Sequence, residues 1–194
     1  MPKNLKNNNF NIVITGVGGQ GVITLAQLIA ESALLEGKDV RTSELHGLSQ
    51  RGGSVETHLR MGKKIYSPLV VWADLILSLE ITEGLRKMQY VSPKTSFLIN
   101  GFSIPYQGGP SEKEISEKIN LIKGKKYLIP ASRICIKELG KEVLSGVFLL
   151  SFAVHNGLIP LRPESVLKTI ENMPEKYVDI NKKAFELAKK YENS

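Results

Sequence analysis

The first 43 residues combine an apolar run, a glycine-rich turn and a helical pattern of apolar positions. Phe10–Thr15 is a short β-branched run that ends in glycines, which is typical of a buried strand. Apolar side chains recur at helical spacing across Gln20–Glu36, and Gly37 is suited to end that helix. A second strand is predicted at Asp39–Ser43. The pattern therefore predicts a right-handed β-α-β unit with parallel strands.

The segment that follows leads into a second series of strand and helix patterns. Ser54–Met61 alternates between apolar and polar residues, and His58 is out of phase with the apolar face, so we expect it at the surface. Lys64–Ser67 is predicted to return as a hairpin partner. Ser111 and Glu114 match a capping box at a helix start. Further strands are predicted at Asp74–Glu80, Thr95–Asn100 and Lys126–Pro130, and helices at Thr82–Gln89, Glu112–Ile122, Glu164–Asn172 and Asp179–Glu192.

The chain changes character after residue 131. Residues 132–157 are predicted to be helical and very apolar, and two more helices follow. Together these patterns predict an α/β fold, with a Rossmann-like, parallel-rich sheet and a C-terminal helical layer at residues 132–194. With no long linker and no internal repeat, residues 1–194 are expected to form a single domain, of which the polar residues 1–9 are loose.

One segment of this layer is more apolar than a surface helix needs. Residues 143–159 are apolar round most of the helix, which predicts an exposed patch that a partner covers and that supports a homodimer contact of the lone chain. The longest apolar run, Val143–Val154, is shorter than the roughly 20 residues of a membrane helix, and residues 1–9 lack the apolar core of a secretory signal. The sequence therefore predicts a cytoplasmic protein with no membrane contact.

Charge and cysteine usage narrow the possible partners. The formal net charge is +7, mostly from scattered lysines. Nucleic-acid surfaces more often combine clustered arginines with aromatic residues, so no nucleic-acid partner is predicted. The charge indicates a solvated surface, or attraction to an acidic partner or to a coenzyme's phosphates. The single cysteine, Cys135, lies in an apolar stretch typical of a core, and the chain shows no metal-ligand spacing. One cysteine cannot hold an iron–sulfur cluster, so any cluster would belong to another chain.

The first candidate site is the turn GVGGQG at residues 16–21, which matches G-x-G-x-x-G between a predicted strand and helix. Its backbone N–H groups and the helix dipole favour an anion. NAD would also require an acid at the end of the second strand, where Arg41 and Thr42 stand and Glu44 lies one residue beyond. The turn therefore has three possible roles. It binds NAD, it binds another phosphate-bearing group or a partner's loop, or its glycines only let the helix pack closely on the strand. The candidate ligand-binding residues are Gly16, Gly18, Gly19, Gln20 and Gly21.

The second candidate site is the polar loop at residues 43–54, which follows the second strand and so belongs to the carboxyl edge of the sheet. Its glycines, Arg51 and hydroxyl and amide donors are suited to gripping an anionic or carbonyl group. Alternatively, Arg51 only pairs with Glu44 or Glu56 and holds the loop. A lone loop histidine such as His46 is more often structural, so no catalytic residue is predicted. The candidate ligand-binding residues are Gln50, Arg51, Gly52, Gly53 and Ser54.

The two glycine motifs, about 30 residues apart, together resemble the gamma-type domain of the 2-oxoacid:ferredoxin oxidoreductase family. The segment Leu48–Arg51 is most similar to the indolepyruvate type, whose beta subunit has this domain. Tyr66-Ser67-Pro68 before the strand at Ala73–Leu77, and Asn181 with Ala184-Phe185, add to the resemblance. It covers roughly residues 10–190, nearly the whole chain.

The resemblance implies an assembly that oxidatively decarboxylates a 2-oxoacid, such as indolepyruvate, to an acyl-CoA. Thiamine diphosphate with magnesium and iron–sulfur clusters would lie in a large partner subunit, with coenzyme A as co-substrate and ferredoxin reached through the complex. This chain alone would hold no cofactor and be inactive. The Gln50–Ser54 loop would face the place where the thiamine-bound intermediate meets coenzyme A. Rival functions are a gamma subunit for pyruvate, 2-oxoisovalerate or 2-oxoglutarate, and a free-standing NAD- or phosphate-binding module.

Overall fold

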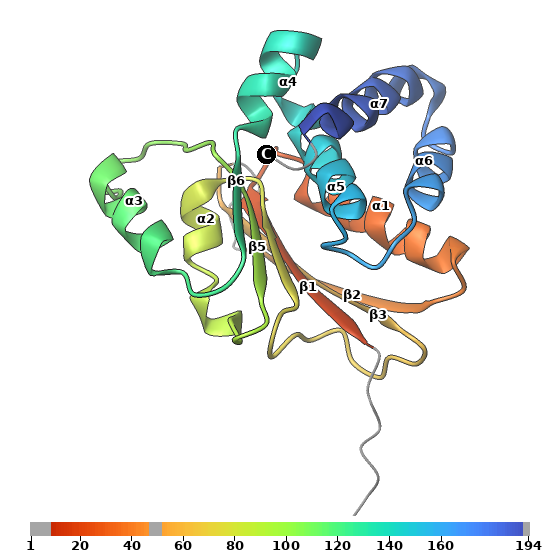
Figure 1. The fold of residues 1–194 in the computed structure, drawn as a ribbon, viewed down its shortest axis with the longest axis horizontal. Coiled ribbons are helices and arrows are strands. Elements are labelled where there is room, and N and C mark those ends of the chain that lie inside the picture. The colour runs from red at the N-terminus through yellow and green to blue at the C-terminus, as the bar shows by residue number, and fades with distance from the viewer. Residues whose placement is uncertain (1–8, 47–51, 192–194) are drawn as a thin grey trace, which may run out of the picture.

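A computed structural model describes residues 9–46 and 52–191. In this part of the chain, six strands form one mixed sheet with helices on both faces (Figure 1). The α/β fold with a mostly parallel sheet is as predicted. The order across the sheet is β2-β3-β1-β4-β5-β6. The strands are β1 (Phe10–Val17), β2 (Asp39–His46), β3 (Ser54–Gly62), β4 (Leu75–Ser78), β5 (Ser96–Asn100) and β6 (Lys126–Ile129).

The first half of the sheet differs from the predicted β-α-β unit. β1 and β2 are not neighbours, because β3 lies between them and pairs antiparallel with both. A short connection between β2 and β3 favours such an antiparallel neighbour, whereas a parallel pair needs a long crossover. From β1 onward, β4, β5 and β6 add in parallel, as the alternation of strands and helices indicated. Residues 63–74 contain no strand, so the predicted hairpin partner at Lys64–Ser67 is wrong.

The helices agree with the predicted ones in number and place except near residue 140. The predicted capping box is confirmed, since Ser111 Oγ accepts from the Glu114 N–H and Glu114 Oε2 accepts from the Ser111 N–H. The long helix expected at 132–157 is divided at Gly140, whose φ of 71° is left-handed and ends the first piece. The helices are α1 (Val22–Leu35), α2 (Ile81–Leu85), α3 (Glu112–Leu121), α4 (Ala131–Leu139), α5 (Ser145–His155), α6 (Pro163–Glu171) and α7 (Glu175–Ala188), with 3₁₀ turns η1 (Met88–Tyr90), η2 (Glu142–Leu144) and η3 (Lys189–Tyr191).

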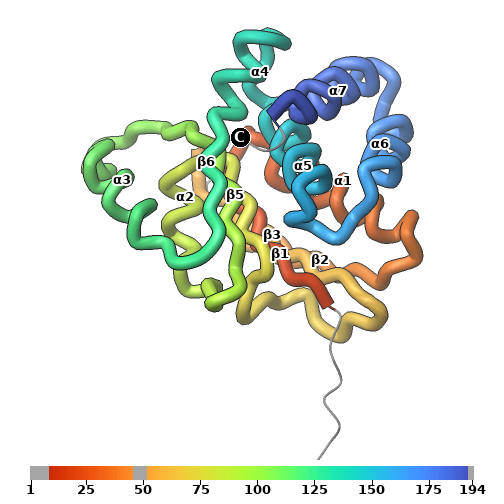
Figure 2. Tube along the Cα trace, in the orientation of Figure 1, coloured from red at the N-terminus to blue at the C-terminus, as the bar shows by residue number. Residues whose placement is uncertain are grey.

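The helices divide between the two faces of the sheet. α1, α5, α6 and α7 cover one face, and α2 and α3 cover the other, as the tube in Figure 2 also shows. Each face has its own cluster of buried apolar side chains, and the one beneath α1 and α5 is the larger. No helix in the described residues is long and apolar enough to cross a membrane.

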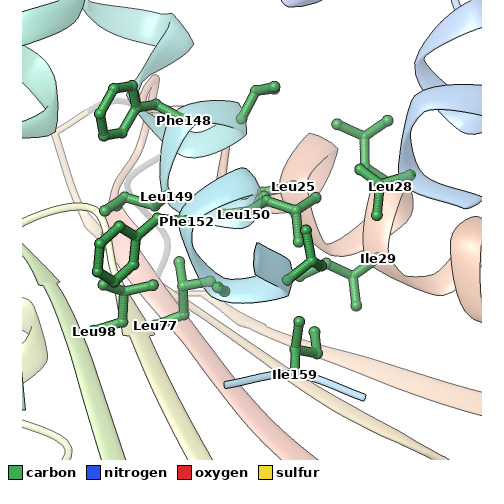
Figure 3. Packing of buried hydrophobic residues seen from close by; sticks show 14 of the residues in the cluster. Leu25, Leu28, Ile29, Leu77, Leu98, Phe148, Leu149, Leu150, Phe152 and Ile159 are labelled. Atoms are coloured by element: carbon green, nitrogen blue, oxygen red, sulfur yellow. The ribbon is translucent and has the colours of Figure 1, made fainter. Parts of the chain in front are cut away.

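The apolar segment at residues 143–159 is the centre of the larger core, and the prediction that it forms an exposed patch is wrong. Every residue from Ser145 to Val154 is buried. α5 lies on the sheet beside α1, and α7 packs against α5. Phe152 reaches toward Leu77 and Leu98 of the sheet (Figure 3). A helix that is apolar all round is one that its own fold surrounds. The homodimer contact was predicted from an exposed patch on this segment, and the structure does not show that patch.

Candidate functional site

The antiparallel pairing of β1 with β3 brings the two glycine motifs together. Val17, at the end of β1, is the register partner of Ser54, at the start of β3. One step further on, the Gly18 N–H donates to the carbonyl oxygen of Gly53 at 2.8 Å. The two segments therefore share the carboxyl edge of the sheet, as predicted. Gln50 and Arg51 lie outside the described residues.

The glycines of the first turn, residues 16–21, have different structural roles. A Cβ on Gly16 would lie 2.9 Å from both Gln20 Oε1 and Val22 Cγ2, so Gly16 lets helix and strand pack closely. Gly19 and Gly21 have φ of 104° and 84°, a left-handed conformation that L side chains rarely adopt. In the second motif, Gly52 has φ of 71°.

Gln20 is tied into the protein rather than directed outward. It is 5% exposed. Its Oε1 accepts from the Val17 N–H at 2.8 Å, and its Nε2 donates to the Leu79 carbonyl at 3.3 Å. The side chain thus occupies a backbone donor that a phosphate-binding turn would offer to its ligand. Gly16 and Gln20 together indicate that the first part of this turn serves close packing of helix on strand rather than binding of a phosphate.

The position of β2 also disfavours a dinucleotide. Because β3 intervenes, β2 stands two strand spacings, roughly 10 Å, from β1. A ribose acid must lie at the end of a strand adjacent to the glycine turn. Glu44 is exposed within β2 on the far edge, so it does not meet this requirement.

A cleft of about 510 Å³ opens where the two motifs meet α2 and the loop after β5. Gly18, Gly52 and Ser54 line it together with side chains that the sequence did not single out. These are Glu80, Thr82, Glu83 and Arg86 from around α2, and Ile104 and Tyr106 from the loop after β5. The only sequence signal for them was their position after a predicted strand, at the edge that carries ligand sites.

Arg86 is the cation of this cleft. Its Nη1 lies 2.6 Å from Glu83 Oε1, and its Nη2 donates to the Tyr106 hydroxyl at 2.8 Å. Partial burial alone would lower the pKa of Arg86, but the neighbouring Glu83 and Tyr106 raise it. The guanidinium is about half exposed and always charged, so it can contact an anionic group that enters the cleft.

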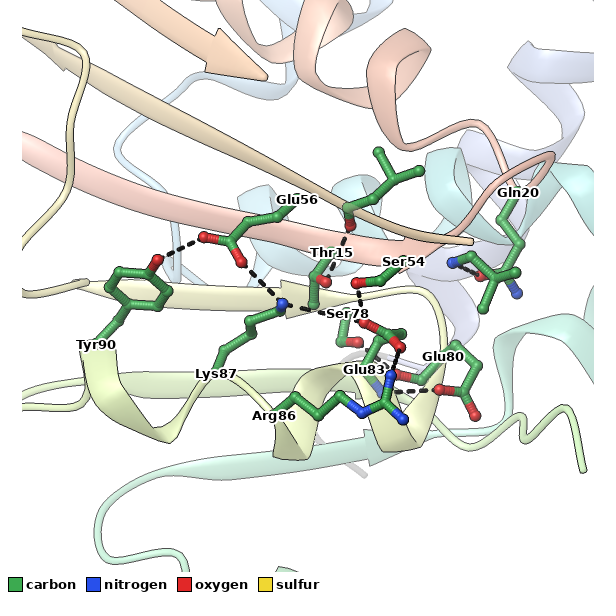
Figure 4. A network of polar contacts seen from close by, with 12 residues as sticks. Thr15, Gln20, Ser54, Glu56, Ser78, Glu80, Glu83, Arg86, Lys87 and Tyr90 are labelled. Atoms are coloured by element: carbon green, nitrogen blue, oxygen red, sulfur yellow. Dashed lines mark hydrogen bonds and ion pairs between the residues drawn. The ribbon is translucent and has the colours of Figure 1, made fainter. Parts of the chain in front are cut away.

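Ser54 connects the second motif to a buried ionic network (Figure 4). Its hydroxyl donates to Glu83 Oε2 at 2.5 Å. Lys87 Nζ lies 4.0 Å from the same carboxylate oxygen and 2.8 Å from Glu56 Oε2. Glu56, Glu83 and Lys87 are all less than a tenth exposed. The network therefore ties the start of β3 to the helix α2 beside the cleft.

His58 belongs to this network and is 3% exposed, so its predicted surface position is wrong. The Val70 N–H donates to His58 Nδ1 at 3.1 Å, which leaves the proton on Nε2, 2.7 Å from Glu56 Oε1. The Tyr90 hydroxyl donates to the same oxygen at 2.6 Å. The polar side of β3 is therefore buried under α2, η1 and residues 63–74. Period-two alternation distinguishes the two faces of a strand but not whether each is covered.

Three donors set the ionisation of Glu56. Burial alone would raise the pKa of its carboxyl, but hydrogen bonds from His58, Lys87 and Tyr90 outweigh burial and lower the pKa from 4.5 to about 2. Glu56 is therefore charged at neutral pH. Its Oε1 accepts from His58 and Tyr90, and its Oε2 lies beside the Lys87 ammonium.

We expect this carboxylate to make stability fall in acid. Because the folded-state pKa is below the unfolded value, the stabilisation is complete above about pH 4.5 and is lost as pH falls toward about 2. The loss is on the order of 3 kcal/mol. Urea unfolding at a series of pH values checks this. Glu56→Gln should flatten the slope in that window, whereas Glu171→Gln, at an exposed pair with Lys182, should not. Equal slopes in all three proteins would contradict it.

No group of three or more His, Cys, Asp or Glu in the described ranges is arranged to hold a metal ion. Cys135 is fully buried, as predicted for a core residue. Burial, with a smaller effect of Glu142, raises the pKa of its thiol to about 12. The thiolate that a metal or cluster requires is thus disfavoured at this position.

The chain is similar to known subunits of oxidoreductases. Residues 11–191 match the family model described as pyruvate ferredoxin/flavodoxin oxidoreductase. The indolepyruvate oxidoreductase subunit IorB of Pyrococcus horikoshii is 38% identical and is aligned over 93% of this chain and 95% of its own. The subunit of the same name from Archaeoglobus fulgidus is 36% identical, over 91% and 92%.

Solved structures share the fold at lower identity. Pyruvate oxidoreductase subunit PORC of Thermotoga maritima has a TM-score of 0.70 and 22% identity, over 94% of this chain and 96% of that one. A 2-oxoglutarate:ferredoxin oxidoreductase of Magnetococcus marinus has a TM-score of 0.74 and 20% identity, over 94% of this chain but 31% of that one. The same fold therefore occurs both alone and as one part of a longer polypeptide.

Proposed function

Since this chain belongs to the pyruvate ferredoxin/flavodoxin oxidoreductase family, we propose that it is the subunit without clusters of an enzyme that oxidatively decarboxylates indolepyruvate or another aryl pyruvate to an acyl-CoA. The observation that carries the substrate class is the ranking of relatives. The four IorB subunits are 31–38% identical over more than nine tenths of the chain. The common gamma subunits of pyruvate/ketoisovalerate oxidoreductases are 28–30% identical.

The proposal assigns the redox groups to a partner. Thiamine diphosphate with magnesium and the iron–sulfur clusters lie in a large subunit, electrons leave through it to ferredoxin, and coenzyme A takes the acyl group. The fully buried Cys135, with its raised thiol pKa, supports this division, because a cluster needs several accessible thiolates. A cytoplasmic location is part of the proposal.

This chain would contribute the cleft at the carboxyl edge. Gly52, Ser54 and Arg86 line it, and the Gly18 N–H donates to the Gly53 carbonyl between them. We expect the cleft, together with Gln50 and Arg51, which precede Gly52 in the sequence, to contact anionic groups of coenzyme A beside the thiamine-bound intermediate. Arg86 is already paired with Glu83, which weakens its attraction for a further anion. Its main contribution would therefore be to orient the anionic group rather than to supply binding energy.

Co-purification with the native large subunit and a ferredoxin-coupled assay over several 2-oxoacids test the function. Turnover should require both subunits, ferredoxin and coenzyme A, and kcat/KM should be highest for aryl pyruvates. If kcat/KM is instead highest with pyruvate, 2-oxoisovalerate or 2-oxoglutarate, this chain is a gamma subunit of an enzyme for that substrate. An active or NAD-binding lone chain would overturn the proposal.

Replacing Arg51 with Ala should reduce turnover roughly 10- to 150-fold, because losing one contact to an anion costs about 1.5–3 kcal/mol. The measurement is kcat and the KM for coenzyme A in the assembled enzyme. Arg41→Ala is the control, since Arg41 pairs with Asp39 on the far strand β2. If Arg51→Ala assembles normally with unchanged turnover and unchanged coenzyme A dependence, the loop only has a structural role.

A further inference from the structure

The connection between β3 and β4, residues 63–74, turns four large apolar side chains to solvent. The exposed fractions are 84% for Tyr66, 55% for Leu69, 69% for Val71 and 58% for Trp72, and these four residues are called the Tyr66–Trp72 patch. The connection joins the end of β3 to the start of β4, so it lies at the amino edge of the sheet, opposite the candidate site. In Figure 1 it is the yellow segment at the bottom of the view.

Buried anchors hold the backbone of this connection. Ile65 and Val70 alternate with the exposed residues and are 3% and 5% exposed. The Val70 N–H donates to the buried His58 ring at 3.1 Å, and Arg60 Nη1 donates to the Ser67 carbonyl at 3.0 Å. The patch is therefore pre-organised. A partner that binds it need not order a mobile loop, which removes one of the main costs of association.

Exposed lysines adjoin the patch in the sequence and lie on other loops at the same edge of the sheet. Lys63 and Lys64 precede it and are exposed, and Lys64 Nζ lies 5.1 Å from the centre of the Tyr66 ring. The loops that lead into β5 and β6 reach the same edge of the sheet and carry three more exposed lysines. These are Lys94, Lys123 and Lys125. An apolar centre with a cationic rim matches a partner surface that has an apolar groove bordered by carboxylates.

We propose that the Tyr66–Trp72 patch docks this chain onto the large cofactor-bearing subunit, through an acid-bordered apolar groove on that subunit. This rests on the proposed function, which requires such a subunit. A second copy of this chain fits poorly, because a two-fold contact uses the same patch on both sides and would bring two sets of exposed lysines together. Ferredoxin fits poorly too, since transient redox encounters bury small areas, whereas permanent interfaces are larger and more hydrophobic.

The single tryptophan gives a direct measurement. With 5-fluorotryptophan incorporated into this chain alone, Trp72 supplies one ¹⁹F resonance, since the chain contains one Trp. Adding the unlabelled large subunit should shift this resonance and remove its solvent-isotope effect. The resonance should not change with the concentration of the lone chain, or on adding ferredoxin alone. A change in either of those cases would assign the patch to a second copy or to ferredoxin and overturn the proposal.

Variants test the affinity. Leu69→Ser with Trp72→Ser should weaken binding of the large subunit by at least about 100-fold, as expected when two central anchors are lost. Lys63→Glu with Lys64→Glu should slow association, most strongly at low salt. The matched control is Leu121→Ser with Ile136→Ser, two exposed apolar residues of α3 and α4 at 74% and 51% exposure. Unchanged affinity in the Leu69/Trp72 variant would overturn the proposal.

The binding and activity measurements separate the two proposals. If the wild-type subunits bind through the patch but the complex oxidises no 2-oxoacid, the docking surface stands and the proposed function fails. If the complex is active and the Leu69/Trp72 variant assembles with unchanged affinity, the function stands and the docking surface is wrong. The substituted side chains are exposed, and unchanged unfolding midpoints will show that the variants are folded.

Discussion

Replacing Lys87 with Met is expected to lower the free energy of unfolding by about 3–5 kcal/mol, the cost of breaking a buried ion pair by removing one partner. Lys87 is 6% exposed, and its ammonium neutralises the carboxylates of Glu56 and Glu83. Met preserves most of the volume, so the loss reports charge rather than a cavity. Urea unfolding at pH 7 measures it.

A second substitution separates charge from packing. Adding Glu56→Gln to Lys87→Met removes the carboxylate that lost its lysine partner and should restore part of the lost stability. Lys137→Met is the matched control, because Lys137 is 80% exposed and only 3.6 Å from an exposed Glu138, so its effect should stay within about 0.5 kcal/mol. A loss below about 1 kcal/mol for Lys87→Met would show that the network contributes little to stability.

Replacing Phe152 with Ala is expected to destabilise the lone chain by about 3–5 kcal/mol, through lost burial and the cavity left behind. Phe152 is 1% exposed, and its ring centre lies 5.8 Å from that of Tyr127. Thermal or urea unfolding of the lone chain measures the loss. Affinity for the large subunit, corrected for the folded fraction, should not change.

Val143 provides the control on the same apolar segment. It is 52% exposed, so Val143→Ala should change stability by less than about 0.5 kcal/mol. If instead Phe152→Ala left the stability of the lone chain unchanged and weakened subunit assembly, α5 would be a partner surface after all. The two variants thus decide whether this segment is core or interface.

Local pattern was sufficient for much of the fold. The β-branched run of β1, the glycine turn, α1 and the Ser111 capping box were all predicted, because each depends on residues close together in the sequence. The positions of β4, β5 and β6 followed from apolar runs between helical patterns. The shared edge of the two glycine motifs also followed, since both come directly at the ends of predicted strands.

What surrounds each element was decided only by the tertiary structure. The sequence showed that α5 is apolar all round and that His58 is on the polar side of β3, but a buried helix and a partner-covered helix have the same pattern. The insertion of β3 beside β1 depends on pairing between residues far apart in the sequence, such as Thr15 with Glu56. Arg86 and Tyr106 likewise line the cleft only because the packed sheet brings α2 and the loop after β5 together there. A residue's own neighbours in sequence determine its periodicity, whereas its burial and its charge partners come from segments that only the packed sheet brings alongside.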